Sequence, residues 1–235
     1  MALPKIDQPL FPITIPSTGQ KTKFRPFTVK EEKILLIAQE SKDFEQVVLA
    51  VKQIINNCVL NIDIDKIAMV DLEYCLLMIR AKSVGNVIEF KIKDPDTEEE
   101  IVLSTDIGAV EVKKSTNESN VVDLENGYSL SMRYPTINDI LVLKNQDRSQ
   151  AENMFDIMIN CIDKLISNDG EEVFEMSDFS PKEIEDFVDD LNSLSIQKIK
   201  KFFEGAPVLR IEIPYKNSNG EEKKYVLEGV ESFFI

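Results

Sequence analysis

The chain has 235 residues, 43% of them hydrophobic, which is enough for one large domain or two small ones with real cores. Its 42 acidic and 27 basic residues give a formal net charge of -15, which repels phosphate and argues against binding to nucleic acid or to an anionic membrane. There is no histidine, so the commonest general base and the commonest metal ligand are both missing.

The cysteines indicate a reducing compartment. Cys58, Cys75 and Cys161 are odd in number and lie in apolar runs, a pattern typical of buried thiols. The first residues show no basic segment followed by an apolar one, and no run of 18 apolar residues occurs in the sequence. We therefore expect a soluble protein of the cytosol.

The first 27 residues are rich in proline, which fixes the backbone and removes hydrogen-bond donors too often for a helix. We expect this segment to be an extended arm. Its apolar residues are too many for a solvated linker, so the arm lies either on the protein's own core or on another protein.

Three helices are predicted after the arm. Residues 28–31 have the spacing of a capping box, which starts the first helix. Apolar residues then recur at three- and four-residue spacing over 43–58 and from 71 to about 85, which predicts the second and third. Three consecutive amphipathic helices need a mutual core. The first helix carries Val29, Lys33, Leu36 and Ile37.

After the third helix, apolar residues occur at every second position instead of every third or fourth. Residues 87–93 and 101–107 alternate on either side of the turn-like sequence DPDTEEE, which predicts a β-hairpin. Short strands are also expected at 108–114 and 128–134, with a polar loop between them.

The second half has a similar order of elements. Thr136 caps a short helix, a longer helix is expected over 149–167, and Ser180 begins a capping box for the next. The sequence SIQKIKKFFEG predicts one more helix, and residues 207–230 have the pattern of a second hairpin.

The two halves therefore end alike, although no repeat is visible at the level of single residues. We predict an α+β fold, mainly helical, with two helical lobes each followed by a β-hairpin or a small antiparallel sheet. The expected parts are an extended proline-rich arm (1–27), a helical lobe with a hairpin (28–115) and a second helical lobe with a C-terminal hairpin (116–235).

Signatures of an enzyme are missing from the sequence. The eight glycines form neither a dinucleotide fingerprint nor a P-loop, and a serine or cysteine nucleophile would have no imidazole partner. Acidic clusters at 63–65, 94–100 and 183–190 lack the full ligand pattern of a calcium loop, so we interpret them as solvated faces and turns. We expect no catalytic residue, no cofactor and no metal.

Binding to other proteins is the remaining function class. Phe202 and Phe203 are adjacent on a predicted helix, so only one can face the core squarely and the other is a candidate for an interface. Phe233 and Phe234 near the C-terminus either tuck into the protein's own core or contact a partner.

Four segments of the sequence also carry a resemblance to a known family. They are LPKIDQPLF, IPSTGQKTKFRPFTVKEEKILLIAQES, LLMIRAKSVGNVIEFKIKDPDTEE and LEGVESFF. They resemble the baseplate hub proteins of contractile-tailed, T-even-type bacteriophages, most strongly over residues 2–113, and KFRPFTVKEEK and RAKSVGN are the most specific parts. The resemblance implies a non-enzymatic role in tail assembly, either as a chaperone-like hub assembly protein or as a permanent hub subunit of the virion.

The resemblance brings no known catalytic or binding residues to this chain. Its motifs contain Phe24, Arg25, Phe27 and Arg80, which we take as candidate arm or interface residues. Our hypothesis is that Arg25 and the two phenylalanines fix the arm to the first helices. The implied partners are other baseplate hub or tail proteins, with a homo-oligomer as an alternative. The implied locations are the host cytoplasm during assembly and, for a permanent subunit, the tail baseplate.

Overall fold

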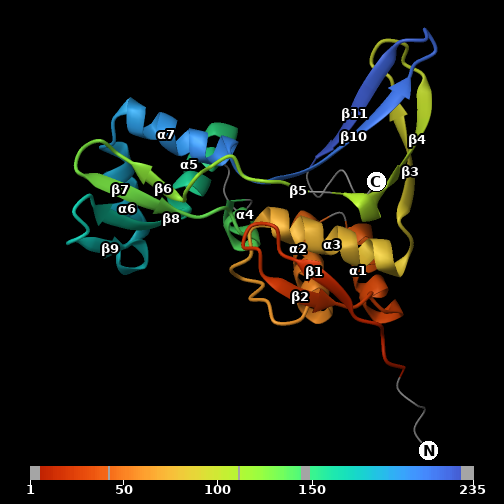
Figure 1. The fold of residues 1–235 in the computed structure, drawn as a ribbon, viewed down its shortest axis with the longest axis horizontal. Helices are drawn as coiled ribbons and strands as arrows, with labels where there is room; N and C mark the ends of the chain where they lie inside the picture. Colours follow the sequence, from red (N-terminus) through yellow and green to blue (C-terminus); the bar gives the residue numbers. More distant parts are fainter. Residues whose placement is uncertain (1–5, 42, 111, 144–148, 229–235) are drawn as a thin grey trace, which may run out of the picture. The chain divides into compact units, whose positions relative to one another are not determined.

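The computed structural model describes residues 6–41, 43–110, 112–143 and 149–228 (Figure 1). The chain forms two compact units. Unit 1 consists of Met1–Lys114 together with Pro207–Ile235, and unit 2 consists of Ser115–Ala206. The second of the two predicted hairpins thus belongs to the same unit as the first half of the chain. The boundaries expected from the sequence, after residues 27 and 115, stay a prediction.

A short hairpin and three helices form the first part of unit 1. The strands are β1 (Phe11–Thr14) and β2 (Lys21–Phe24), and the helices are α1 (Val29–Ser41), α2 (Phe44–Cys58) and α3 (Met69–Ser83). The predicted helices are confirmed, and in α2 and α3 the apolar residues at helical spacing form the core. In α2 the buried residues include Val48, Val51, Ile54, Ile55 and Cys58.

Two longer hairpins complete the described part of unit 1, and both were predicted from the sequence, the first of them by alternating apolar residues. Strand β3 (Val87–Lys93) pairs with β4 (Glu100–Asp106), which η1 (Ile107–Ala109) follows. Strand β10 (Val208–Lys216) pairs with β11 (Glu222–Glu228) and with β5 (Val112–Lys113). The hairpins pack side by side (Figure 1), with the ring centroids of Phe90 and Tyr225 5.6 Å apart.

In its described residues, unit 2 combines a four-stranded antiparallel sheet with four helices. The sheet has the order β6 (Val121–Asp123), β7 (Tyr128–Met132), β8 (Ile162–Ser167) and β9 (Val173–Glu175). The helices are α4 (Ile137–Leu143), α5 (Gln150–Asn160), α6 (Pro181–Asp189) and α7 (Ser193–Glu204), with η2 (Met176–Asp178) before α6. Leu130, Met132, Met158, Ile199 and Phe202 lie in the core.

The prediction of a mainly helical fold with two helical lobes is wrong. Helices make up 40% of the structure and strands 28%, and the described strands form four small antiparallel sheets, so the fold is a mixed α+β fold. One cause is the helix expected over 149–167, because α5 ends at Asn160 and residues 162–167 form β8. Their backbone groups pair with β7 and β9, a long-range preference that helical spacing alone cannot reveal.

Candidate functional site

Arg25 and Glu31 lie at the junction between the first hairpin and the helices of unit 1. The guanidinium of Arg25 donates to Glu31 with an Nη2 to Oε1 distance of 2.8 Å, and its backbone N–H donates to the carbonyl of Cys58 at 2.9 Å. The backbone N–H of Thr28 donates to Glu31 at 2.8 Å, and the Thr28 hydroxyl donates to the same carboxylate. We call Arg25, Thr28, Glu31 and the Cys58 carbonyl the first arginine cluster. It ties β2 to both α1 and the end of α2.

The charges of this cluster stabilise one another. Burial acts to raise the pKa of Glu31, which is only 4% exposed, but the hydrogen bonds from Arg25 and Thr28 outweigh burial and lower the pKa to about 2. The hydrogen bond to Glu31 in turn raises the pKa of Arg25. Glu31 is therefore ionised at neutral pH and serves as the acceptor at the start of α1.

The other motif residues in unit 1 have different environments. Phe24 is buried, with its ring centroid 5.7 Å from that of Phe11. Phe27 is half-buried and its N–H donates to the hydroxyl of Ser83 at 2.9 Å, which connects the arm to the end of α3. Arg80 is half-buried, and burial lowers its pKa. The structure thus ties Phe27 to α3 and Arg25 to α1.

Helix α1 presents apolar side chains to solvent. Val29 is 66% exposed, Leu36 52% and Ile37 66%, whereas the buried residues of the helix are Glu31 and Ala38 on its other side. We call Val29, Leu36 and Ile37 the α1 apolar face. Because the core occupies the opposite side of the helix, these residues do not join the mutual core expected for the three helices. The charged residues Lys33 and Glu40 are exposed on the same side of the helix, among these three. Large apolar side chains that gather on one exposed side of a helix are candidates for a protein-binding surface.

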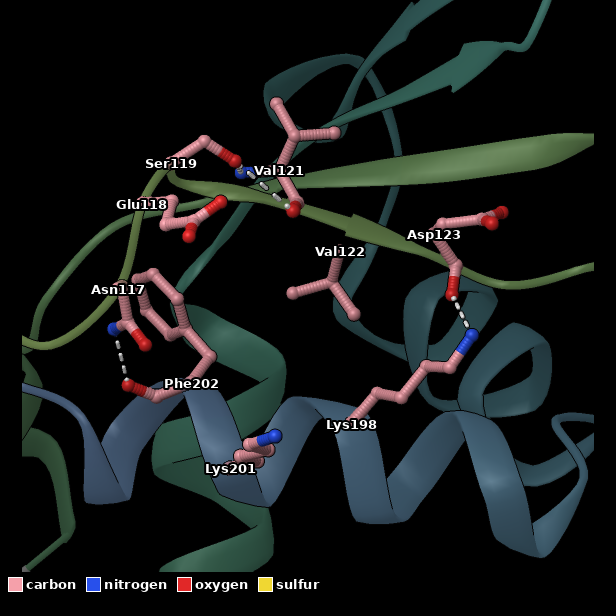
Figure 2. Close-up of a pocket in the computed structure, with 9 residues that line it drawn as sticks. All are labelled: Asn117, Glu118, Ser119, Val121, Val122, Asp123, Lys198, Lys201 and Phe202. Carbon is pink, nitrogen blue, oxygen red and sulfur yellow. Dashed lines mark hydrogen bonds between the residues drawn. The ribbon is translucent and has the colours of Figure 1, made fainter.

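A groove lies between β6 and α7 in unit 2, and Figure 2 shows its walls. It has a volume of about 330 Å³. At one end the Asn117 side chain donates to the carbonyl of Phe202 at 2.7 Å, and at the other Lys198 donates to the carbonyl of Asp123 at 3.0 Å (Figure 2). The rest of its lining is formed by Glu118, Ser119, Val121, Val122 and Lys201.

A family model described as T4 bacteriophage base plate protein matches residues 8–235. The chain belongs to this family. No curated protein and no solved structure matches it. The family indicates a structural or assembly protein of a phage baseplate, which agrees at this level with the resemblance seen in the sequence.

The remaining predicted site residues of this baseplate protein lie on α7 or outside the described residues. Phe202 is 4% exposed and stacks on Tyr134 with ring centroids 5.0 Å apart. Phe203 is half-buried, packs edge-on against Phe202 and contacts the same core. Phe233 and Phe234 lie outside the described residues. A partner contact by any of these residues stays a prediction.

Acidic side chains and thiols are the groups that could hold a metal ion in the part of this baseplate protein that the structure describes. No three acidic or cysteine side chains come close enough there to hold a metal ion. The predicted burial of the three thiols is confirmed, and burial raises the pKa of Cys58 to about 11 and that of Cys75 and Cys161 to about 12. None of the helices described is long and apolar enough to cross a membrane.

Sequence reasoning missed the α1 apolar face of the baseplate protein and the groove. The face had a visible signal, because residues 34–38 are five consecutive apolar residues, ILLIA, and these cover every side of a helix. Some of them must then point away from any single core. The groove had no such signal, since it depends on the packing of α7 against β6, two elements far apart in the sequence.

Proposed function

We propose that this baseplate protein is a non-enzymatic assembly protein of the baseplate hub, which binds other hub components while the tail is built. The α1 apolar face carries the proposal. Removing large aliphatic side chains from water contributes about 1 to 2 kcal/mol for each one, so a partner that covers Val29, Leu36 and Ile37 gains affinity mainly from this surface.

The net charge of -15 supports a chain that is soluble before it binds. Like charges keep copies of the protein apart, and the same field favours encounter with a basic surface. An assembly protein needs both properties, because it exists free in the host cytoplasm and then meets a hub component. The partner expected on this basis has an apolar patch with basic residues around it.

A second candidate function is a permanent structural subunit of the hub in the virion. Exposed apolar side chains outside α1 favour it, since a permanent subunit must bury larger surfaces. Phe174 is 37% exposed and Phe179 39%, with ring centroids 6.4 Å apart in unit 2, and Val173 beside them is 51% exposed. A subunit that stays in the particle would cover these residues as well.

The deciding experiment is quantitative mass spectrometry of purified phage particles and of baseplate assembly intermediates. An assembly protein is present in intermediates and absent from finished particles, whereas a permanent subunit is present in both at a fixed ratio to the other hub proteins. Absence from both would contradict the two candidates together. A separate measurement, the mass of the purified protein in solution, tests whether it forms a homo-oligomer.

A further inference from the structure

Unit 2 contains a second cluster that is built like the first arginine cluster. The guanidinium of Arg133 contacts the two carboxylate oxygens of Asp139 at 2.7 and 2.9 Å. The backbone N–H and the hydroxyl of Thr136 donate to the same carboxylate, each at 2.7 Å. The backbone N–H of Arg133 donates to the carbonyl of Cys161 at 2.8 Å. We call these four residues the second arginine cluster.

The two clusters share their spacing in the sequence as well as their hydrogen bonds. In each, the acidic residue lies six positions after the arginine and three positions after the threonine. Each arginine side chain also donates to the carbonyl of the residue that follows it, at 3.0 Å for Arg25 and 3.3 Å for Arg133. Arginine, threonine, acid and cysteine carbonyl thus have matching roles.

The backbone on either side of the clusters also matches. Phe24, the residue before Arg25, forms an antiparallel bridge with Val59, the residue after Cys58. Met132, the residue before Arg133, pairs antiparallel with Ile162, the residue after Cys161. All four paired residues are buried. Each cluster therefore joins the end of a hairpin to the end of the second helix that follows it.

The hairpins before the two arginines correspond in the same way. The N–H of Ile15 donates to the carbonyl of Gln20, and the N–H of Leu124 donates to that of Tyr128, at 2.8 and 3.0 Å. In both turns a glycine with positive φ precedes the acceptor, with φ of 69° and 92°. Ile15 and Leu124 are both buried. The second turn is one residue shorter.

A capping box alone would not relate the two units, because threonine followed by an acid three residues later starts many unrelated helices. The arginine, its backbone contact to a cysteine carbonyl and the strand pairing around both are not parts of that common signal. They combine residues from three elements in the same chain order. If the two clusters had arisen independently, each would have had to acquire the same set of contacts by itself.

We infer that residues 12–59 and 121–162 contain two copies of one motif, a hairpin fixed by an arginine cluster to a pair of helices. Arg25 and Arg133 are equivalent positioning residues in these copies. The duplication is hidden in the sequence because the copies share few side chains outside the clusters. This inference goes beyond the proposed function and does not depend on it.

Hydrogen exchange of the full-length protein, followed by mass spectrometry, tests the equivalence. Arg25→Met and Arg133→Met keep a flexible, unbranched apolar stem and remove the charge and the donors of the guanidinium. Arg25→Met should speed exchange in residues 11–31 by about tenfold or more, and Arg133→Met should do the same in residues 121–139. Each variant should leave the other motif unchanged. Lys91→Met, which removes a cation from an exposed pair with Glu100, is the control and should change neither motif.

The inference is overturned if either arginine variant leaves its own motif unchanged or if both variants open the same region. Should an arginine variant not fold, Glu31→Asp and Asp139→Glu provide the second test, since each places the acid of one copy in the other. Equivalent positions predict that both exchanged acids retain more protection than Glu31→Ala and Asp139→Ala. Equal loss in the exchanged and alanine variants would contradict equivalence.

Discussion

The phenolic hydroxyl of Tyr215 donates a 2.8 Å hydrogen bond to the carboxylate of Asp94, which lies 121 residues earlier in the chain. Asp94 is fully buried and its other oxygen accepts the backbone N–H groups of Asp96 and Thr97, so it organises its own turn at the same time. Lys223 approaches within 3.5 Å of Asp94. These contacts fasten the two long hairpins of unit 1 to each other.

Replacing Tyr215 by phenylalanine should weaken this connection while retaining the ring. Asp94 keeps its turn contacts, so we expect the melting temperature to fall by only about 2–4 °C. Thermal unfolding followed by circular dichroism measures the change. Tyr225→Phe is the matched control, because the ring of Tyr225 packs on Phe90 and its hydroxyl has no hydrogen bond to another described residue. Equal melting temperatures for Tyr215→Phe and the unchanged protein would contradict the role of Asp94.

Glu31→Gln should destabilise the protein by about 3 kcal/mol at pH 7, because it leaves Arg25 half-buried without its ion pair. The folded pKa of Glu31, about 2, is below its ordinary value of 4.5, so its stabilisation is fully present above pH 4.5. It is lost as the pH falls from 4.5 towards 2. The difference in urea stability between the two proteins should therefore shrink over this range. The exposed neighbour Glu32 provides the control Glu32→Gln, and a difference as large at pH 3 as at pH 7 would refute the prediction.

The effect of Asp71→Asn on stability should depend on pH in the opposite sense to that of Glu31→Gln. The carboxylate of Asp71 accepts the N–H of Ser17 at 2.8 Å and also the Ser17 hydroxyl, but it is fully buried, and burial raises its pKa. A raised folded pKa means that the native state loses stability as the pH rises from 3.8 through the folded value. Asparagine can bond to both Ser17 groups without a charge. At pH 7 the Asp71→Asn variant should thus be at least as stable to urea as the unchanged protein. This gain in stability should disappear at low pH.

Asp71→Ala is the control for that experiment, since it leaves both Ser17 groups without their acceptor. It should cost about 1–3 kcal/mol at every pH where the protein folds. Urea midpoints from pH 4 to pH 8 give both comparisons. If Asp71→Asn lost as much stability as Asp71→Ala at pH 7, the charge of Asp71 would be a stabilising feature and our account of its burial would fail.

Serine substitutions on the α1 apolar face should separate folding from assembly. A triple variant carries Val29→Ser, Leu36→Ser and Ile37→Ser. Because all three residues are exposed, its melting temperature should stay within a few degrees of that of the unchanged protein. Tail assembly by a phage that carries the triple variant should fall, because a partner can no longer bury this face. The matched control changes three exposed apolar residues elsewhere in unit 1 to serine, namely Val84, Val87 and Val102. Normal assembly with the α1 variant, or an equal defect in the control, would rule out a specific role for this face.

Short-range hydrogen bonding explains what could be predicted from the sequence. The capping box at Ser180 forms as expected, since it needs only a side chain and an acid three residues later. A capping box also forms at Ser149, where a helix start, but no cap, was expected from the sequence. At Thr28 the expected acid does reach back to the backbone N–H, but the hydroxyl donates to Glu31 and thereby joins the arginine cluster. Local sequence thus located this helix start without revealing its long-range partner.

The sequence by itself determined the helix starts, the alternating strands of the two long hairpins, the buried thiols and the acidic charge, because each follows from neighbouring residues or from composition. Only the tertiary structure decided that residues 162–167 are a strand, that Asp94 meets Tyr215, and that Arg25 and Arg133 occupy equivalent clusters. These features join groups that are distant in the chain. Their free energy arises only after burial has removed water and brought both partners together, so no local pattern encodes them.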